Sequence, residues 1–323
     1  MKSYLTLVLL FILVKQGFAQ QDPQFSQYMF NTLVINPAYA GYRETKNISL
    51  LHRDQWTGFE GAPKTQSLIA DGAFGSDNKV GLGLSLVSDK AGLQRQTSAH
   101  ANYAYRLPVG EDARLAMGVS IGVGQFTLNS SDANVQDETD PNFGDKQTYF
   151  VPDARVGVHY STSKFYAGLS ATNLISNSIN YQQVGKNTIA RQGRHYFLTA
   201  GYLFDINSNF KLKPSFLLRE DAKGPTSLDI NSFVLIKESV WIGASYRSGV
   251  NLWKKTDWNS STFSQNSLVG VVEAFVLRNL RVGYSYDYSL SDLSNYTNGT
   301  HEISLGFTLN TNKKSALLTP RYF

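Results

Sequence analysis

Residues 80–87 read VGLGLSLV and residues 115–124 read LAMGVSIGVG, so bulky apolar side chains alternate with glycine, alanine and serine. Successive side chains of a β-strand point to opposite faces, and this period of two predicts strands with one apolar and one small or polar face. In a water-soluble sandwich the apolar face forms the core. In a membrane barrel the apolar face meets lipid and surrounds a polar lumen.

Residues 1–19 have the pattern of a secretory signal peptide. Lys2 gives a positive start, residues 4–14 are almost wholly apolar, and Gly17-Phe18-Ala19 fits a cleavage site with small residues. We therefore expect an exported protein whose mature chain begins at Gln20.

Composition narrows the possible classes of protein. The 323 residues include no cysteine, which excludes a disulfide scaffold, thiolate zinc sites and cysteine nucleophiles. The net charge of +5 falls to +3 once Lys2 and Lys15 leave with the signal peptide, so charge says little about partners. No apolar run after residue 19 approaches the ~20 residues of a membrane helix. A membrane location therefore requires a closed barrel, because lipid cannot satisfy open strand edges.

Fourteen alternating segments lie between turn signals along the chain. The predicted strands span residues 45–54, 64–74, 79–89, 94–107, 113–128, 149–161, 164–173, 194–205, 209–220, 226–237, 239–248, 264–277, 279–290 and 299–310. Every second connection is short, as at 75–78 and 206–208. The others include long polar stretches at 55–63, 129–148, 174–193, 249–263 and 291–298. This asymmetry is typical of outer-membrane barrels, which have short periplasmic turns and long outer loops.

We therefore predict an all-β transmembrane antiparallel barrel of about fourteen strands. The expected organisation is a signal peptide (1–19), an N-terminal segment (20–43), an outer-membrane barrel (44–311) and a C-terminal tail (312–323). An even strand number places both termini in the periplasm. The N-terminal segment is too apolar for a free tail, and we expect it to plug the lumen or to cap the periplasmic side.

Several motifs resemble those of one known family, PorP/SprF. They are Asp22-Pro23-Gln24-Phe25-Ser26-Gln27-Tyr28-Met29-Phe30-Asn31, Asn36-Pro37-Ala38-Tyr39-Ala40-Gly41, Arg53-Asp54-Gln55-Trp56-Thr57-Gly58-Phe59-Glu60-Gly61-Ala62-Pro63, Gly283-Tyr284-Ser285-Tyr286-Asp287-Tyr288, Gly299-Thr300-His301-Glu302-Ile303-Ser304-Leu305-Gly306 and Pro320-Arg321-Tyr322-Phe323. The resemblance extends over the mature chain. It implies an integral outer-membrane component of the type IX secretion system of Bacteroidetes. It also implies two kinds of partner, a secreted surface protein such as a gliding adhesin and other secretion subunits.

The residues of the sequence give little indication of catalysis. The five histidines are His52, His100, His159, His195 and His301, and the sequence contains neither a G-x-S-x-G elbow nor an H-E-x-x-H pair. The acidic loop 129–148 lacks the residue order of a calcium loop. We expect no catalytic residue, no cofactor, no metal site, no nucleic acid and no small-molecule substrate.

Charged residues fall inside several predicted strands, where exposure of Arg or Lys to lipid costs ~2–4 kcal/mol near the midplane. We expect six of them to face inward and to pair with one another: Arg155, Arg247, Arg281, Glu273, Asp287 and Glu302. They could line a selective pore or fill a blocked interior, and the apolar N-terminal segment favours the blocked interior.

Aromatic and terminal residues are the candidates for partner contact, because Trp, Tyr and Arg dominate interface energies. The candidates are Phe25, Tyr28, Phe30, Trp56, Phe59, Trp253, Trp258, Arg321, Tyr322 and Phe323. Two functions remain open: a non-enzymatic barrel that docks a secreted protein or secretion machinery, and a diffusion or uptake channel of the fatty-acid-transporter type. The tryptophans of residues 249–263 could equally lie at the lipid interface.

Overall fold

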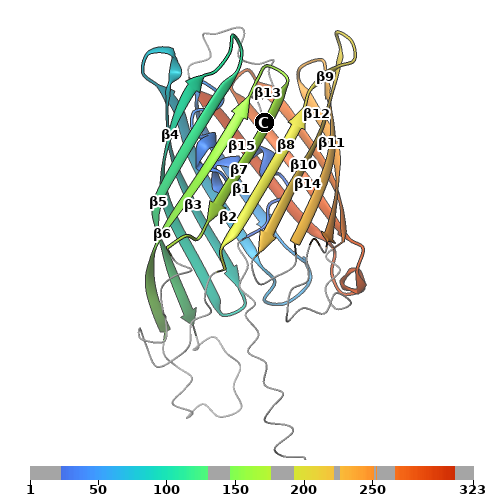
Figure 1. Cartoon of the computed structure of the whole chain (residues 1–323). Coiled ribbons are helices and arrows are strands. Elements are labelled where there is room, and N and C mark those ends of the chain that lie inside the picture. Colours follow the sequence, from blue (N-terminus) through green and yellow to red (C-terminus); the bar gives the residue numbers. More distant parts are fainter. Residues whose placement is uncertain are drawn as a thin grey trace, which may run out of the picture.

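The structure of the chain is a computed structural model that describes residues 23–129, 146–175, 193–221, 226–250, 252 and 266–309. These residues form a barrel with a short helical segment inside the ring of strands (Figure 1). None of the described helices is long and apolar enough to cross a membrane.

The strands follow one another around the barrel in chain order. They are β1 (Lys46–Asp54), β2 (Lys64–Phe74), β3 (Val80–Ala91), β4 (Gln94–Pro108), β5 (Arg114–Asn129), β6 (Lys146–Ser161), β7 (Phe165–Thr172), β8 (His195–Tyr202), β9 (Phe204–Asp205), β10 (Phe210–Asp221), β11 (Thr226–Ile236), β12 (Val240–Val250), β13 (Ser267–Leu277), β14 (Leu280–Ser289) and β15 (Thr300–Leu309). All neighbours are antiparallel, and β1 pairs with β15 to close the ring.

The prediction of fourteen strands is confirmed, because β8 and β9 both pair with β10 and together make one strand of the wall. The sequence predicted one strand over 194–205. The break falls at Leu203, whose amide donates to the carbonyl of Lys164 at 2.8 Å and whose side chain is buried.

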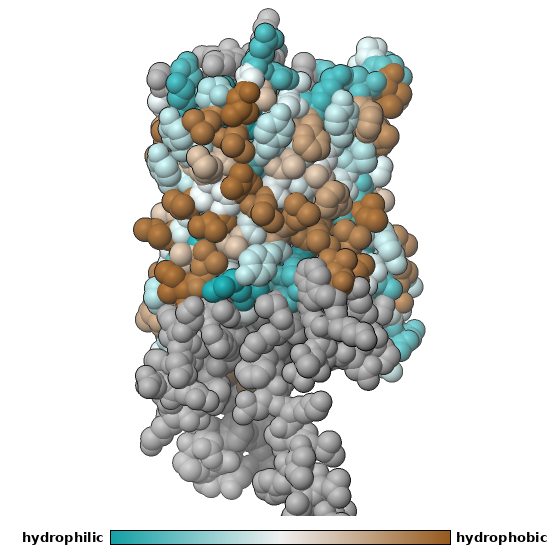
Figure 2. Space-filling view, viewed as in Figure 1, coloured by the Kyte–Doolittle hydropathy of each residue, from teal (hydrophilic) through white to brown (hydrophobic). Residues whose placement is uncertain are grey.

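The predicted alternation of faces is also confirmed. On β5, Met117, Val119 and Ile121 point outward with exposed fractions of 47%, 53% and 71%, while Ser120 between them is buried. Leu82 and Leu84 are exposed in the same way on β3. Figure 2 shows hydrophobic side chains spread over the outer wall of the barrel.

Residues 23–43, the described part of the N-terminal segment, contain three short 3-10 helices. These are η1 (Tyr28–Phe30), η2 (Thr32–Val34) and η3 (Pro37–Tyr39). Asn36 begins η3, because its side chain accepts a 2.9 Å hydrogen bond from the amide of Ala38 and Pro37 supplies a preset φ angle. η3 contacts β4, β5 and β6. A Cβ atom at Gly118 of β5 would overlap the backbone of Ala38, so the close approach requires glycine.

The N-terminal segment runs along the lumen from one end of the barrel to the other. Ser26 and Gln27 bond to Glu302, which follows the long loop 290–299. Gly41 bonds to Asp71, close to the short turn between β2 and β3. The first described residues therefore lie toward the long-loop end.

The start of the first strand and the end of the last strand lie at the opposite end of the barrel from residue 23. Lys46 and Leu309 are register partners at the short-turn end, the upper rim in Figure 1. The expectation that both termini share one side of the membrane therefore applies to the strand ends, whereas the N-terminal segment spans both ends of the lumen. Which membrane side each end occupies stays a prediction.

The outward position of Val119 gives a direct test of the lipid-facing wall. Val119→Arg places a charge against hydrocarbon, and we expect it to destabilise the barrel by about 2–4 kcal/mol or to block assembly. Heat resistance on detergent gels after membrane isolation measures this. Val119→Leu is the matched control and should behave like the parent, whereas equal heat resistance of the Arg variant would show that this face does not meet lipid.

Candidate functional site

A group of buried ion pairs lies where the first and last strands of the barrel meet. Arg53 on β1 is 3% exposed and donates to Glu302 on β15 at 2.9 Å and to Asp287 on β14 at 2.8 Å. Arg53 and Glu302 are register partners across the closing pair of strands. One guanidinium therefore neutralises two buried carboxylates and joins three neighbouring strands.

The N-terminal segment completes this group through the start of its chain. Glu302 accepts the backbone amides of Ser26 at 3.0 Å and of Gln27 at 2.7 Å. The Ser26 hydroxyl donates to Asp287 at 2.5 Å, and the Gln27 side chain accepts from Ser304 at 2.6 Å. These bonds fix the backbone of two consecutive residues against the closing strands.

A second buried pair extends the group around the lumen. Arg247 on β12 donates to both carboxylate oxygens of Asp229 on β11, with Nε 2.9 Å and Nη2 2.8 Å from the nearer oxygens. The same guanidinium donates to the carbonyl oxygen of Phe25 at 3.4 Å and lies 4.0 Å from Asp287. We call this group the N-terminal latch; it comprises Ser26, Gln27, Arg53, Asp229, Arg247, Asp287 and Glu302.

Further contacts hold the middle of the N-terminal segment. Arg155 donates to the carbonyl of Val34 at 2.6 Å, and Ser170 donates to that of Ile35 at 2.7 Å. Further around the wall, the side chain of Asn231 on β11 donates to the hydroxyl of Tyr28 at 2.6 Å. Together with the bonds to Glu302 on β15, which lies across the ring from β7, these contacts join the segment to both sides of the lumen.

The prediction that six strand charges face inward is confirmed, whereas their pairing with one another holds only for Arg281 with Glu273 and, at 4.0 Å, for Arg247 with Asp287. Arg281 bonds to Glu273 at 3.1 Å, Arg155 lies 3.6 Å from Asp153, and the other three belong to the N-terminal latch. All six side chains are buried. The guanidinium of Arg281 also lies over the ring of Phe30, 5.6 Å from its centroid.

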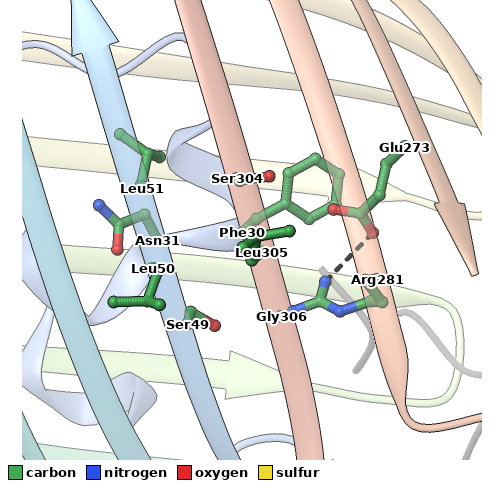
Figure 3. A pocket seen from close by; sticks show the side chains of 10 residues that line it. All are labelled: Phe30, Asn31, Ser49, Leu50, Leu51, Glu273, Arg281, Ser304, Leu305 and Gly306. Atoms are coloured by element: carbon green, nitrogen blue, oxygen red, sulfur yellow. Dashed lines mark hydrogen bonds and ion pairs between the residues drawn. The ribbon is translucent and has the colours of Figure 1, made fainter.

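Small cavities remain between the N-terminal segment and the wall. One of about 10 Å³ is lined by Phe30, Asn31, Leu51, Glu273 and Arg281 (Figure 3). Another of about 20 Å³ is lined by residues that include Tyr28, His159 and Lys213. Each is large enough for about one water molecule and too small for an organic solute.

Three of the five histidines, His100, His159 and His195, are buried and contact neighbouring side chains. His100 lies 3.4 Å from Asp153 and His195 lies 3.4 Å from Asp221, all buried on inward faces. His159 packs edge-on against Tyr42 at 4.8 Å between ring centroids. No group of three or more metal-ligating side chains occurs among the described residues.

The structure distributes the proposed partner residues over different environments. Phe25, Tyr28 and Phe30 are 4–5% exposed inside the lumen. Trp56 is half-buried and Phe59 is 56% exposed at the long-loop end. The remaining candidates, Trp253, Trp258, Arg321, Tyr322 and Phe323, lie outside the described residues. The described candidates do not meet in one surface, and their role in partner contact stays a prediction.

Sequence reasoning missed Arg53 and Asp229 as members of the latch. A signal for Arg53 was available, because Ile48 and Leu50 set the outward phase of β1 and leave Arg53 on the inward phase. Asp229 stands on the inward phase of β11 between the buried Ser227 and Asn231.

The closed sheet, its apolar outer wall and its charged interior define an outer-membrane β-barrel. Within that class, the chain belongs to the family described as Type IX secretion system membrane protein PorP/SprF, which matches residues 17–307. A comparison with curated proteins gives no match.

Solved structures of similar fold include channels and transporters. The CymD monoaromatic hydrocarbon channel has 11% identity and a TM-score of 0.53, with 90% of this chain and 94% of that chain covered. The Ralstonia pickettii toluene transporter TbuX has 11% identity and a TM-score of 0.50, with 87% and 94% covered. At this identity the likeness establishes the barrel fold alone.

The N-terminal latch predicts that removal of a buried cation lowers the unfolding free energy far more than removal of an exposed one. Arg53→Ala leaves two buried carboxylates without their shared cation, and we expect it to cost about 3–5 kcal/mol of unfolding free energy. Lys64→Ala is the matched control, because Lys64 pairs with Asp54 at 3.4 Å on the outer face with 67% of its side chain exposed. An exposed pair contributes about 0–1 kcal/mol. Urea unfolding in detergent measures both, and equal losses would contradict the latch.

Proposed function

We propose that the chain is a non-enzymatic component of the type IX secretion system that docks a secreted surface protein or secretion machinery at the outer membrane. Membership of the PorP/SprF family supports the link to secretion. The observation that carries the docking role is the N-terminal segment, which the latch bonds into the lumen. A barrel with its own chain inside acts through its rims and not through its lumen.

The orientation is part of the proposal. Outer-membrane barrels have short periplasmic turns, so the long-loop end faces the cell exterior and the ends of the strand ring at Lys46 and Leu309 face the periplasm. Cargo then meets the long loops, while secretion subunits meet the short turns and the C-terminal tail.

Two long loops form one connected surface at the proposed outer end. The amide of Thr57 donates to the carbonyl of Gly299 at 2.8 Å, and the amide of Asn298 donates to the carbonyl of Thr57 at 2.8 Å. This surface presents Phe59 and Tyr296, which are 56% and 72% exposed. Exposed aromatic side chains on an ordered backbone favour protein contact, because little entropy is lost on binding.

The docking role is tested with the double variant Phe59→Ser and Tyr296→Ser. Loss of two aromatic contacts should lower the amount of secreted surface protein that co-purifies with the barrel by roughly tenfold. The matched control is Val109→Ser with Ile206→Ser, because these residues are exposed by 52% and 60% at the short-turn end. Barrel abundance is measured in the same membranes. Unchanged co-purification from the double variant would reject this surface as the docking site.

A channel is the competing function. CymD and TbuX are described as a channel and a transporter, and their fold is shared by this chain. The two small cavities beside the N-terminal segment each hold about one water molecule, which supports a filled lumen over an open channel.

Planar bilayer recordings separate the two functions. We expect the parent barrel to be silent, and a variant lacking residues 24–41 to show open-channel conductance because a fourteen-strand lumen is wider than its wall side chains can fill. Deletion of residues 316–323 is the control and should leave the barrel silent. Parent conductance equal to that of the 24–41 deletion would favour the channel.

A further inference from the structure

Three basic side chains lie next to one another on the outer wall near the long-loop end. Lys64 on β2 is the register partner of Lys90 on β3, and Lys90 is the register partner of Arg95 on β4. All three side chains are exposed and share the outward phase of their strands. We call them the cation row.

From the cation row toward the middle of the barrel, the outward side chains of these three strands change from charged to polar and then to apolar. Two residues closer to the middle of the barrel, the same strands present Gln66, Ser88 and Thr97, which are register partners of one another. Two residues further, they present Leu68, Leu86 and Ala99. At ~3.3 Å per residue, the cation row lies ~13 Å along the strands from the first apolar row. Strands tilted by ~40° make this ~10 Å along the membrane normal, a height from which long Lys and Arg side chains reach the lipid headgroups.

The charges of the cation row are not balanced within the described part of the wall. Lys64 lies 3.4 Å from Asp54 on β1, the carboxylate that flanks the row. Among the described residues no ion pair is formed by Lys90 or Arg95. Asp89, next to Lys90, bonds to the hydroxyl of Thr65. Like charges directly opposite one another destabilise a sheet, so an external anion is favoured here.

We propose that Lys64, Lys90 and Arg95 bind the phosphate groups of lipid A, the membrane anchor of lipopolysaccharide. Neighbouring strands lie about 4.8 Å apart, so the row presents several cations to more than one phosphate on one headgroup. The row of Gln66, Ser88 and Thr97 below it offers an amide and two hydroxyls to the sugar and amide groups of the same lipid. The proposal rests on the outward orientation of the long-loop end given under the proposed function.

Binding of diphosphoryl lipid A to the purified full-length barrel in neutral detergent tests the proposal. The variant K64Q/K90Q/R95Q should bind roughly 100-fold more weakly than the parent, since each of the three basic residues near an anionic surface contributes about a fivefold factor. The matched control is K79Q/K164Q/K237Q, which removes three cations at the short-turn end and should bind like the parent. The charge-preserving variant K64R/K90R/R95K should also retain binding, which separates loss of charge from misfolding.

Two results would overturn the proposal. The first is binding of lipid A by K64Q/K90Q/R95Q within twofold of the parent. The second is binding of phosphatidylglycerol as tight as that of lipid A and equally lost in this variant, which would assign the cation row to phospholipid headgroups. Co-purification of the secreted protein, measured on the same variants, should not change. Loss of lipid A binding with normal co-purification therefore supports this site, and failure of docking with intact lipid binding concerns the proposed function alone.

Discussion

Hydrocarbon offers no hydrogen-bond partner to a backbone amide or carbonyl, and this constraint determines the architecture of the chain. Every strand must be paired on both edges, so β1 pairs with β15 and the sheet closes. After closure, the outward face of the sheet must be apolar where it meets hydrocarbon, and charged side chains at that depth must lie on the inward face. The outward face carries residues such as Val119 and Ile121, whereas strand charges such as Arg247 and Glu302 are buried toward the lumen.

A lumen formed by fourteen strands is too wide for wall side chains alone to fill. The inward charges then need partners, because an unpaired buried charge costs several kcal/mol. Arg53 satisfies Asp287 and Glu302, and the remaining carboxylate lone pairs accept the amides of Ser26 and Gln27. The N-terminal segment and the charges therefore stabilise one another: the segment supplies donors, and the wall fixes its backbone.

The barrel follows from short-range sequence information. Alternation along each strand gave its face, and the alternation of loop lengths gave the antiparallel order. The break between β8 and β9 did not follow, because it depends on the bond of Leu203 to Lys164 in a different turn. The sequence also did not predict that the latch residues meet in one group. Ser26 and Asp287 are 261 residues apart, and no local pattern reports which inward side chains face each other across a lumen.

The family motifs gain a physical meaning from the same contacts. Ser26 and Gln27, Arg53, Asp287 and Glu302 belong to four motifs that are far apart in the sequence and meet in one buried group. Arg53 and Glu302 lie opposite each other on the two strands that close the ring. The Arg53 contacts of the latch therefore require the first and last strands to pair, which couples completion of the latch to barrel closure. An unclosed barrel would leave Glu302 and Asp287 without their cation, so the buried charges favour the closed ring over open intermediates.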